Sequence, residues 1–260
     1  MQFYSDDSTK SPAVKLSVFT YKLLAFIIRC EVNSMKETQS KLFFEAIAKF
    51  SLGVVLLGLL IFWPAGTFAY WQGWLFMSLL FIPMFCAGLV MMARNPMLLR
   101  SRLDAKEKQR EQDLVVKLSG LMFMSGFIVS GLNFRFGWYI LPKTVSLIAS
   151  VVFLLSYLLY AEVLRENTYL SRTIKVQENQ KVIDTGLYGI VRHPMYFATV
   201  LLFLSMPLIL ASLQAFIIFL AYPLIIAKRI KHEESFLEKE LPGYSEYKSK
   251  VKYRILPYIW

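Results

Sequence analysis

Two short polar clusters stand at the edges of an apolar block in this chain of 260 residues. The first, Arg192–Pro194 with Tyr196 behind it, lies in the stretch GLYGIVRHPMYFAT at residues 186–199. The second is Arg229 with Glu233, four residues further along the predicted helix that leaves the block. Ionisable side chains are costly next to lipid, and cations, carboxylates and aromatic rings together can bind a polar ligand. The pattern therefore indicates a polar pocket at a membrane surface.

Each cluster alone also has an ordinary explanation. Arg192 and His193 can extend to lipid headgroups, and the nearby tyrosines can belong to an interfacial aromatic belt. Arg229 and Glu233 can form a helical ion pair worth about 0.2–0.5 kcal/mol. Two clusters that each combine a cation with a partner, on the same side of a helical hairpin, favour a shared pocket over these separate explanations.

The apolar residues form blocks, as in a membrane protein. Hydrophobic residues make up 56% of the chain and charged residues 18%, which is more apolar than a typical soluble domain. Phe50–Ala93 and Pro194–Ala227 are long uncharged blocks, and Leu118–Phe134 and Thr144–Ala161 are shorter ones. A membrane span needs about 20 apolar residues, so each long block predicts two helices and each short block one. The predicted fold is all-α: a multi-pass membrane protein of about six transmembrane helices with a cytoplasmic C-terminal helical tail.

Turn-forming residues divide the two long blocks. Residues 64–74, PAGTFAYWQGW, combine Pro and Gly with aromatic residues typical of a membrane surface. The second block has a polar break at 210–215, LASLQA. Pro207 and Pro223 interrupt the two short helices of that block, which suits the wall of a cavity better than a face toward lipid.

Lysine and arginine alternate between the predicted loops. Of 29 such residues, 27 fall on the N-terminal arm, the loops 94–117 and 162–192, and the tail, which leaves two in 135–143. This distribution predicts that both termini are cytoplasmic. The net charge of +11 then reflects topology and attraction to anionic membrane lipids. No nucleic-acid partner is expected, because the basic residues are not gathered in one soluble domain.

Three regions follow from this organisation. Residues 1–46 form an N-terminal cytoplasmic or interfacial extension, in which basic residues seven apart predict an amphipathic helix on the membrane. Residues 47–230 form the transmembrane domain, and residues 231–260 form a cytoplasmic tail that completes the site. Met35 is an alternative start, because it directly precedes the first span.

Several kinds of site are disfavoured by the motifs that the sequence lacks. Two cysteines, Cys30 and Cys86, and two histidines offer no zinc-ligand spacing, so no metal site is expected. The glycine motifs of Rossmann dinucleotide sites and of P-loops are absent. The groups present would suit a zwitterion that carries a ribose, since they offer donors for a carboxylate, an acceptor for an amine or diol, and aromatic faces.

Two segments of the chain together resemble the isoprenylcysteine carboxyl methyltransferase family and the related phospholipid methyltransferases. They are TGLYGIVRHPMYFAT and, about thirty residues later, RIKHEESFLEKELPGYSEYKSKVKYRILP. The resemblance spans about 95 residues, 165–260, and PAGTFAYWQGWLF and RFGW further upstream are similar to bacterial members. It implies an integral membrane methyltransferase that moves a methyl group from S-adenosylmethionine to a lipophilic acceptor. A multi-pass protein of a bacterial inner membrane is the expected location.

The resemblance also implies residue roles. Arg229 and Glu233 are the expected catalytic residues: Arg229 would hold the carboxylate of an acceptor, and Glu233 would bind the methyl donor. An amine or thiol acceptor would need a general base, for which Glu233 and Glu234 are candidates. The expected methyl-donor contacts are Gln177, Lys181, Val182, Ile183, Tyr188, His193, Pro194, Tyr196 and Glu233. Ala198 stands where the family usually has glycine, a change that would narrow the pocket or a helix contact.

Two other functions compete with methyl transfer. Sterol reductases that use NADPH have a similar helical end and a related motif, but they usually carry Asn before the motif tyrosine and an acidic residue soon after it. Met195 and Ala198 stand there instead, which favours methyl transfer. A transporter or scaffold subunit is disfavoured, because no ionisable residue lies in the middle of a predicted span. The acceptor stays open between a prenylated carboxyl terminus and a small lipid, isoprenoid or other hydrophobic carboxylate, with membrane lipids as further partners.

Overall fold

The structure is a computed structural model that describes residues 40–103, 110–167, 169, 176 and 180–260. It divides into two compact units, residues 1–49 and 50–260. In the first unit the description begins with the helical residues from Ser40 onward, so the predicted amphipathic helix and Met35 lie outside the described residues. The fold and the site below belong to the second unit.

The described residues are helical, with one isolated β-bridge between Ile140 and Ser212. The all-α prediction is therefore confirmed. In chain order the helices are Ser40–Ala65, α2 (Trp71–Arg94), α3 (Pro96–Leu103), α4 (Arg110–Phe136), α5 (Lys143–Glu166), the 3-10 turn η1 (Gly186–Gly189), α6 (Pro194–Ile209), α7 (Leu213–Phe219), α8 (Ala221–Glu240) and α9 (Tyr244–Lys250).

Five described helices are long and apolar enough to cross a membrane. They are Ser40–Ala65, Trp71–Arg94, Leu114–Phe136, Lys143–Glu166 and the combined Leu213–Glu240. The remaining predicted span is α6, which is apolar but has only 16 residues. The predicted count of about six thus corresponds to five full-length helices and one short helix.

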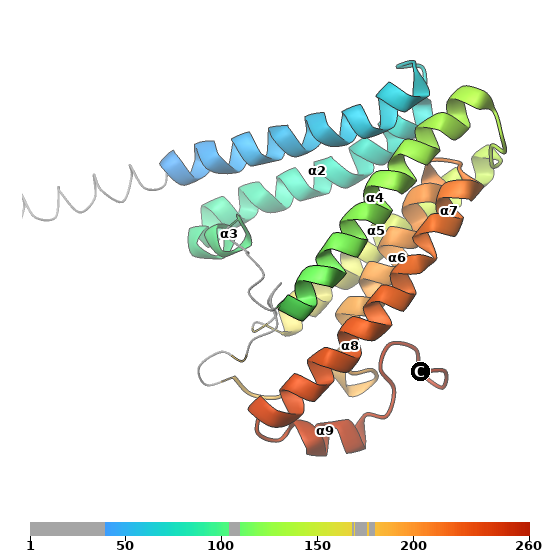
Figure 1. Ribbon diagram of the computed structural model, residues 1–260. Helices are drawn as coiled ribbons and strands as arrows, with labels where there is room; N and C mark the ends of the chain where they lie inside the picture. The colour runs from blue at the N-terminus through green and yellow to red at the C-terminus, as the bar shows by residue number, and fades with distance from the viewer. Residues whose placement is uncertain (1–39, 104–109, 168, 170–175, 177–179) are drawn as a thin grey trace, which may run out of the picture. The chain divides into compact units, whose positions relative to one another are not determined.

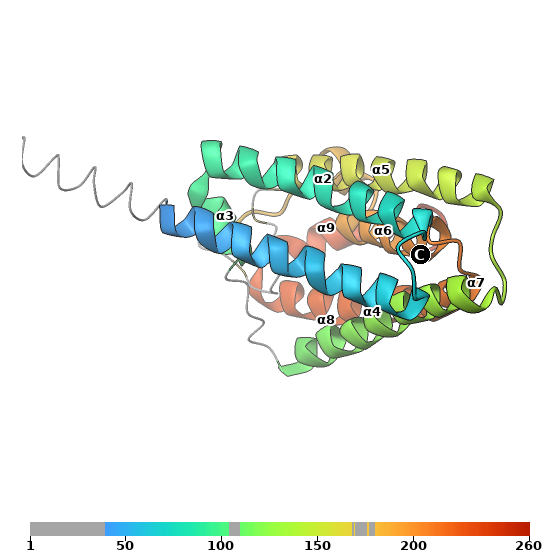
Figure 2. The same cartoon turned by 90° about the horizontal axis from the view of Figure 1, so that it is seen from above.

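The main packing contacts in the second unit form two groups of helices (Figures 1 and 2). α6 packs along α5, and α4 packs along α7 and α8. α5 and α6 are antiparallel, because the start of α5 meets the end of α6: the Ser146 hydroxyl donates to the Leu208 carbonyl at 3.4 Å. At the same end the Leu141 N–H donates to the Ala211 carbonyl at 3.0 Å.

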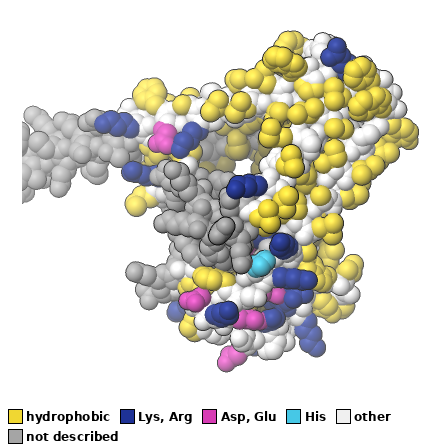
Figure 3. Space-filling view, in the orientation of Figure 1, with side chains coloured by type: hydrophobic (Ala, Val, Ile, Leu, Met, Phe, Trp, Pro, Cys, Tyr) yellow, Lys and Arg dark blue, Asp and Glu magenta, His cyan; other side chains and the backbone are white. Residues whose placement is uncertain are grey.

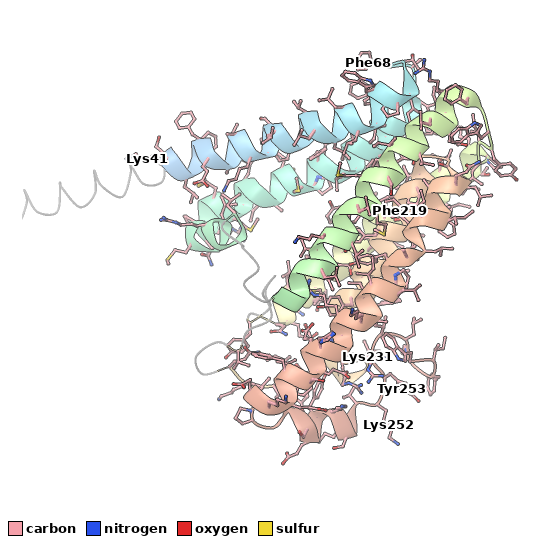
Figure 4. All side chains as sticks on the ribbon, in the orientation of Figure 1. Lys41, Phe68, Phe219, Lys231, Lys252 and Tyr253 are labelled. Atoms are coloured by element: carbon pink, nitrogen blue, oxygen red, sulfur yellow. The ribbon has the colours of Figure 1, made fainter. Side chains whose placement is uncertain are left out.

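Two glycines of α4 allow close helix packing. A Cβ on Gly126 would overlap the ring of Phe219, which Figure 4 labels, and a Cβ on Gly131 would lie 2.5 Å from the Ile61 carbonyl oxygen. Small residues at such contacts let helices in a membrane approach closely. Buried aromatic rings from several helices fill the core around them.

Proline weakens the last span as predicted, whereas Pro207 does not interrupt α6. Pro223 has no N–H to donate to the carbonyl four residues earlier, and the helix breaks at Leu220, between α7 and α8. Pro207 lies inside α6, which ends at Ile209. Ser212 then caps α7 by accepting a hydrogen bond from the Ala215 N–H at 3.3 Å.

Polar and apolar surfaces are separated along the second unit. Figure 3 shows hydrophobic side chains over α4 and α7, and charged side chains gathered at the end where α8 meets α9. This end also carries the loop into α6, since the Tyr247 hydroxyl of α9 donates to the Tyr188 carbonyl of η1 at 2.7 Å. The two clusters singled out from the sequence lie here.

Candidate functional site

A tight turn delivers the Arg-His-Pro motif to the start of α6. Gly186 has φ +49°, the left-handed region that glycine adopts without strain, and it opens the 3-10 turn η1. His193 then occupies the N-cap of α6 and Pro194 its first position, where the missing N–H of proline costs no hydrogen bond.

Glu166, the last residue of α5, holds this turn in place. Its carboxylate accepts hydrogen bonds from the Leu187 N–H at 3.1 Å and from the Thr185 hydroxyl at 3.4 Å. The carboxylate occupies the space beside Gly186, so a Cβ at that position would overlap it. The α5 span is therefore connected directly to the motif.

Glu234 is the centre of a buried ionic cluster. Its carboxylate oxygens lie 2.8 Å from Arg192 Nε and 2.9 Å from Arg254 Nε, and His193 Nε2 lies 3.2 Å away. Glu234 is 2% exposed and Arg192 5% exposed. A charge this deep is stable only when it is paired and hydrogen-bonded, and two guanidinium groups supply that pairing.

The segment after α9 completes the cluster by pairing with the motif backbone (Figure 4 labels Lys252 and Tyr253). The Arg192 N–H donates to the Tyr253 carbonyl at 2.9 Å, and the His193 N–H donates to the Arg254 carbonyl at 2.8 Å. Arg192 Nη1 also donates to the Lys252 carbonyl at 2.8 Å. The motif is thus bound through both its backbone and its side chains.

The last residue of the chain supports Arg254. The guanidinium of Arg254 lies over the Trp260 ring, 5.3 Å from its centroid. The Trp260 carbonyl accepts hydrogen bonds from the N–H groups of Arg254, Ile255 and Leu256 at 2.9, 3.0 and 3.2 Å. Arg254 is therefore held between an aromatic ring and the Glu234 carboxylate.

Tyr196 connects the two sequence clusters. Its hydroxyl donates to Glu233 Oε2 at 2.6 Å and accepts a hydrogen bond from Arg229 Nε at 2.9 Å. The sequence pattern suggested a direct pair between Arg229 and Glu233, whereas the structure joins them through this buried hydroxyl. The adjacent carboxylates of α8 consequently have separate partners: Glu233 faces Tyr196, and Glu234 faces Arg192.

Buried tyrosines form a second wall of the site. The Tyr188 hydroxyl accepts a hydrogen bond from Asn167 Nδ2 at 3.0 Å. Burial raises the pKa of Tyr188 to about 12, so its hydroxyl stays neutral across the physiological range. Tyr244 and Tyr247 of α9 are also buried.

A cavity lies among these groups, and we call it the polar cavity. Its wall is made by Asn167, Tyr169, Gln180, Lys181, Val182, Ile183, Tyr188, Arg192, His193, Met195, Tyr196, Arg229, Glu233, Leu237, Leu241, Tyr244 and Tyr247. Residues from the loop before η1, from α6, from α8 and from α9 meet there.

Most site residues proposed from the sequence lie around this cavity. Lys181–Ile183, Tyr188, His193, Tyr196, Arg229 and Glu233 all contribute to its wall. Pro194 is fully buried at the start of α6 and is not part of the wall. Gln177 lies outside the described residues.

A second cavity, which we call the span cavity, adjoins the polar cavity. Its wall is made by Val115, Val116, Ser119, Gly120, Phe123, Tyr160, Met195, Tyr196, Thr199, Phe203, Tyr222, Ile226 and Arg229. Three of these residues, Met195, Tyr196 and Arg229, also belong to the polar cavity. The two cavities therefore meet at Tyr196, one among tail residues and the other among the apolar spans.

This arrangement can hold a polar ligand and a lipophilic ligand on either side of Tyr196. The polar cavity offers a carboxylate, hydroxyls and an imidazole, and the span cavity offers aliphatic and aromatic side chains with Arg229 at the junction. Within the described ranges, no group of three or more His, Cys, Asp or Glu residues is placed to hold a metal ion.

Sequence reasoning missed two features of the site. Arg254 was not singled out, because it lies 20 residues beyond its partner Glu234 and belongs to no helical pattern. Glu234 was considered only as a base beside Glu233. Consecutive helix positions point about 100° apart, so the two carboxylates had to face different neighbours, and this signal was available in the sequence.

Comparisons with known proteins agree with this geometry. Residues 147–239 match the model of the isoprenylcysteine carboxyl methyltransferase (ICMT) family. The fold matches the structure of the eukaryotic intramembrane Ras methyltransferase ICMT with a TM-score of 0.50 and 19% identity, covering 96% of this chain and 98% of that one. The resemblance stated from the sequence is confirmed.

A curated relative belongs to a different class of enzyme. The Delta(14)-sterol reductase TM7SF2 of Mus musculus is 30% identical over 91 residues, which cover 34% of this chain. The match spans 22% of that reductase, so the chain corresponds to about a fifth of its length.

Proposed function

We propose that this chain, whose residues 147–239 match the isoprenylcysteine carboxyl methyltransferase family, is an integral membrane methyltransferase. Its methyl donor would be S-adenosylmethionine, and its acceptor a lipophilic molecule with a carboxylate. The single observation that carries the proposal is the junction of two unlike cavities at Tyr196 and Arg229. Transfer between a polar donor and a lipophilic acceptor requires such a junction.

The polar cavity suits the methyl donor in its chemistry. S-adenosylmethionine supplies an electrophilic methyl group on a sulfonium, together with a zwitterionic end and a ribose. Glu233 can accept hydrogen bonds from an amine or a diol, and Tyr188 and Tyr196 offer aromatic faces to a cation or a base. His193, Lys181, Val182 and Ile183 complete the proposed contacts, and Gln177 stays a prediction.

The chain's own residues contribute positioning and exclusion of water. Arg229 holds the acceptor carboxylate at the junction, where its guanidinium also touches the Tyr196 hydroxyl. The loop segment 180–183 and the tail segment 241–247 form part of the wall of the polar cavity and would separate a bound donor from water. In a one-step displacement, where the acceptor attacks the methyl group of the donor, the protein lowers the barrier mainly by holding the two reactants in line and by excluding water. A carboxylate acceptor needs no general base.

The location follows from the same reading. We place the polar cavity on the cytoplasmic side with both termini, because lysine and arginine concentrate in the N-terminal arm, alternate loops and tail. A bacterial inner membrane is the location that the resemblance to bacterial members implies. The acceptor would enter the span cavity from the bilayer. It is a lipidated or isoprenoid carboxylate in this proposal.

A membrane reductase is the second candidate, and the match to the mouse sterol reductase over 91 residues favours it. A calorimetric titration of the detergent-purified full chain distinguishes the two. We expect saturable binding of S-adenosylhomocysteine and none of NADPH. Binding of NADPH alone would replace the proposal with a reductase.

Two variants test the residue roles. Arg229→Ala should abolish methyl transfer and keep S-adenosylhomocysteine affinity, whereas His193→Ala should weaken that affinity. Lys228→Ala is the matched control, because Lys228 is exposed and adjacent to Arg229. Full activity of Arg229→Ala would contradict the role assigned to Arg229. Unchanged affinity of His193→Ala for S-adenosylhomocysteine would show that His193 is not part of the donor site.

A further inference from the structure

The hydroxyl of Tyr244 is a buried polar group with no hydrogen-bond partner among the described residues. The side chain is 4% exposed and contributes to the wall of the polar cavity. The neighbouring Tyr247 is equally buried, but its hydroxyl donates to the Tyr188 carbonyl at 2.7 Å. Two tyrosines three positions apart on α9 therefore differ in one respect: the hydroxyl of Tyr247 is used within the fold, and that of Tyr244 is not.

An unsatisfied buried hydroxyl costs free energy, because it gives up its bonds to water without a replacement. Such groups are rare in native proteins and need a specific explanation. Packing alone does not supply one here. A phenylalanine ring at position 244 would fill the same space, contact Leu241, Tyr247 and Val251 in the same way, and avoid the cost.

The position of the Tyr244 ring is determined by the backbone and by its neighbours. Gly243 has φ +84° and forms the N-cap of α9, so the chain turns sharply just before Tyr244. Leu241, Tyr247 and Val251 are buried in the same small cluster. The ring is thus held against the polar cavity independently of its hydroxyl.

We infer that Tyr244 is a ligand-binding residue whose hydroxyl donates a hydrogen bond to an oxygen or nitrogen atom of the bound methyl donor. The inference rests on the proposed function, since it concerns the ligand of the polar cavity. Tyr244 was not among the contacts implied by the family resemblance. It comes from α9, so it would connect the tail to the donor.

The hydroxyl is suited to act as a hydrogen-bond donor. Burial raises the pKa of Tyr244 above its ordinary value, and the nearby carboxylates of Glu234 and Glu233 raise it further. The hydroxyl therefore keeps its proton at neutral pH. Those carboxylates have other partners, Glu233 in Tyr196 and Glu234 in Arg192 and Arg254, which leaves the Tyr244 proton for a ligand.

The test is Tyr244→Phe in the full chain, with two measurements. In calorimetric titration, S-adenosylhomocysteine should bind about three- to tenfold more weakly, as expected for one lost hydrogen bond. In thermal unfolding without ligand, the midpoint should stay the same or rise, because the variant removes an unsatisfied group. Weaker binding together with undiminished stability is a combination that a purely structural role does not produce.

Tyr247→Phe is the matched control. It removes a hydroxyl that donates to the Tyr188 carbonyl, so it should lower the thermal midpoint without ligand. Unchanged affinity in Tyr244→Phe would overturn the inference, and so would an affinity loss accompanied by a lower midpoint. If the unaltered chain does not bind S-adenosylhomocysteine, the proposed function fails, and that outcome is distinct from failure of Tyr244 alone.

Discussion

Replacing Gly186 with alanine tests how the motif loop is held. The position has φ +49°, which L-residues with a Cβ rarely adopt. A Cβ there would also overlap the Glu166 carboxylate. Glu166 would have to move, and its hydrogen bond from the Leu187 N–H, now 3.1 Å long, would be lost.

The expected cost can be worked out from these two effects. Left-handed backbone costs a residue with a Cβ roughly 1–2 kcal/mol. A hydrogen bond to a charged acceptor contributes about 1.5–3 kcal/mol. Gly186→Ala should therefore destabilise the chain by about 2.5–5 kcal/mol, which corresponds to a midpoint lower by roughly 5–20 °C at about 2–4 °C per kcal/mol.

Gly137→Ala separates the two effects. Gly137 has φ +63°, and a Cβ there would meet nothing within 4 Å. It should cost only the roughly 1–2 kcal/mol of backbone strain. Thermal unfolding in detergent and titration with S-adenosylhomocysteine measure both variants, and only Gly186→Ala should also weaken binding, because η1 carries Tyr188. Equal midpoints and equal affinities for the two variants would refute the role given to Glu166.

Three further predictions concern the site itself. Glu234→Gln leaves Arg192 and Arg254 without their carboxylate, which should lower the free energy of unfolding by about 3–5 kcal/mol. Thermal unfolding measures this loss, and an unchanged midpoint would contradict the stabilising role of the buried cluster. Tyr196→Phe removes the hydroxyl shared by a cation and a carboxylate of α8. Methyl transfer to lipophilic carboxylates should slow at least tenfold, and the midpoint should fall by roughly 3–12 °C, as expected for a lost hydrogen bond to a charged acceptor. Burial raises the pKa of Tyr188 to about 12, so the folded state keeps a proton that the unfolded chain releases above about pH 10. The contribution of this group to the free energy of unfolding should be constant below pH 10 and should fall by about 1.4 kcal/mol per pH unit up to pH 12. When unfolding is measured from pH 9 to 11.5, the stability of Tyr188→Phe should therefore decline less steeply than that of the unaltered chain.

The transmembrane helices could be predicted from the sequence because their signal is local. The charged residues on either side of an uncharged block such as Thr144–Ala161 indicate where a span begins and ends, and α5 extends over Lys143–Glu166. Proline acts locally as well, so Pro223 predicted a weakened last span, and the break lies at Leu220. The shortness of α6 followed from its limits, Pro194 and the polar turn after Ile209.

The partners within the site could not be predicted in the same way. The spacing of Arg229 and Glu233 suggested a direct helical pair, but Tyr196 from α6 lies between them. Which of two adjacent carboxylates faces Arg192 depends on the rotation of α8 about its axis. Local sequence does not determine that rotation, because it results from packing against α4 and α6.

The tail shows the same limit at longer range. Arg254 reaches Glu234 only because the segment after α9 pairs with the backbone of Arg192 and His193. That pairing joins residues about sixty positions apart and leaves no periodic pattern. The buried hydroxyl of Tyr244 likewise became apparent only with the surrounding atoms in place.

The buried cluster around Glu234 also imposes an order of assembly on the chain during synthesis. Ribosomal synthesis delivers the N-terminal parts first, so Arg192 is complete before Glu234, and Arg254 follows later still. Until Arg254 arrives, the carboxylate has half of its guanidinium partners, and the motif backbone lacks the carbonyls of residues 251–254. The residues that line the polar cavity are therefore complete before the Glu234 cluster is. A chain interrupted before Arg254 would keep its membrane helices and its cavity wall, and its Glu234 carboxylate would keep only Arg192 as a guanidinium partner.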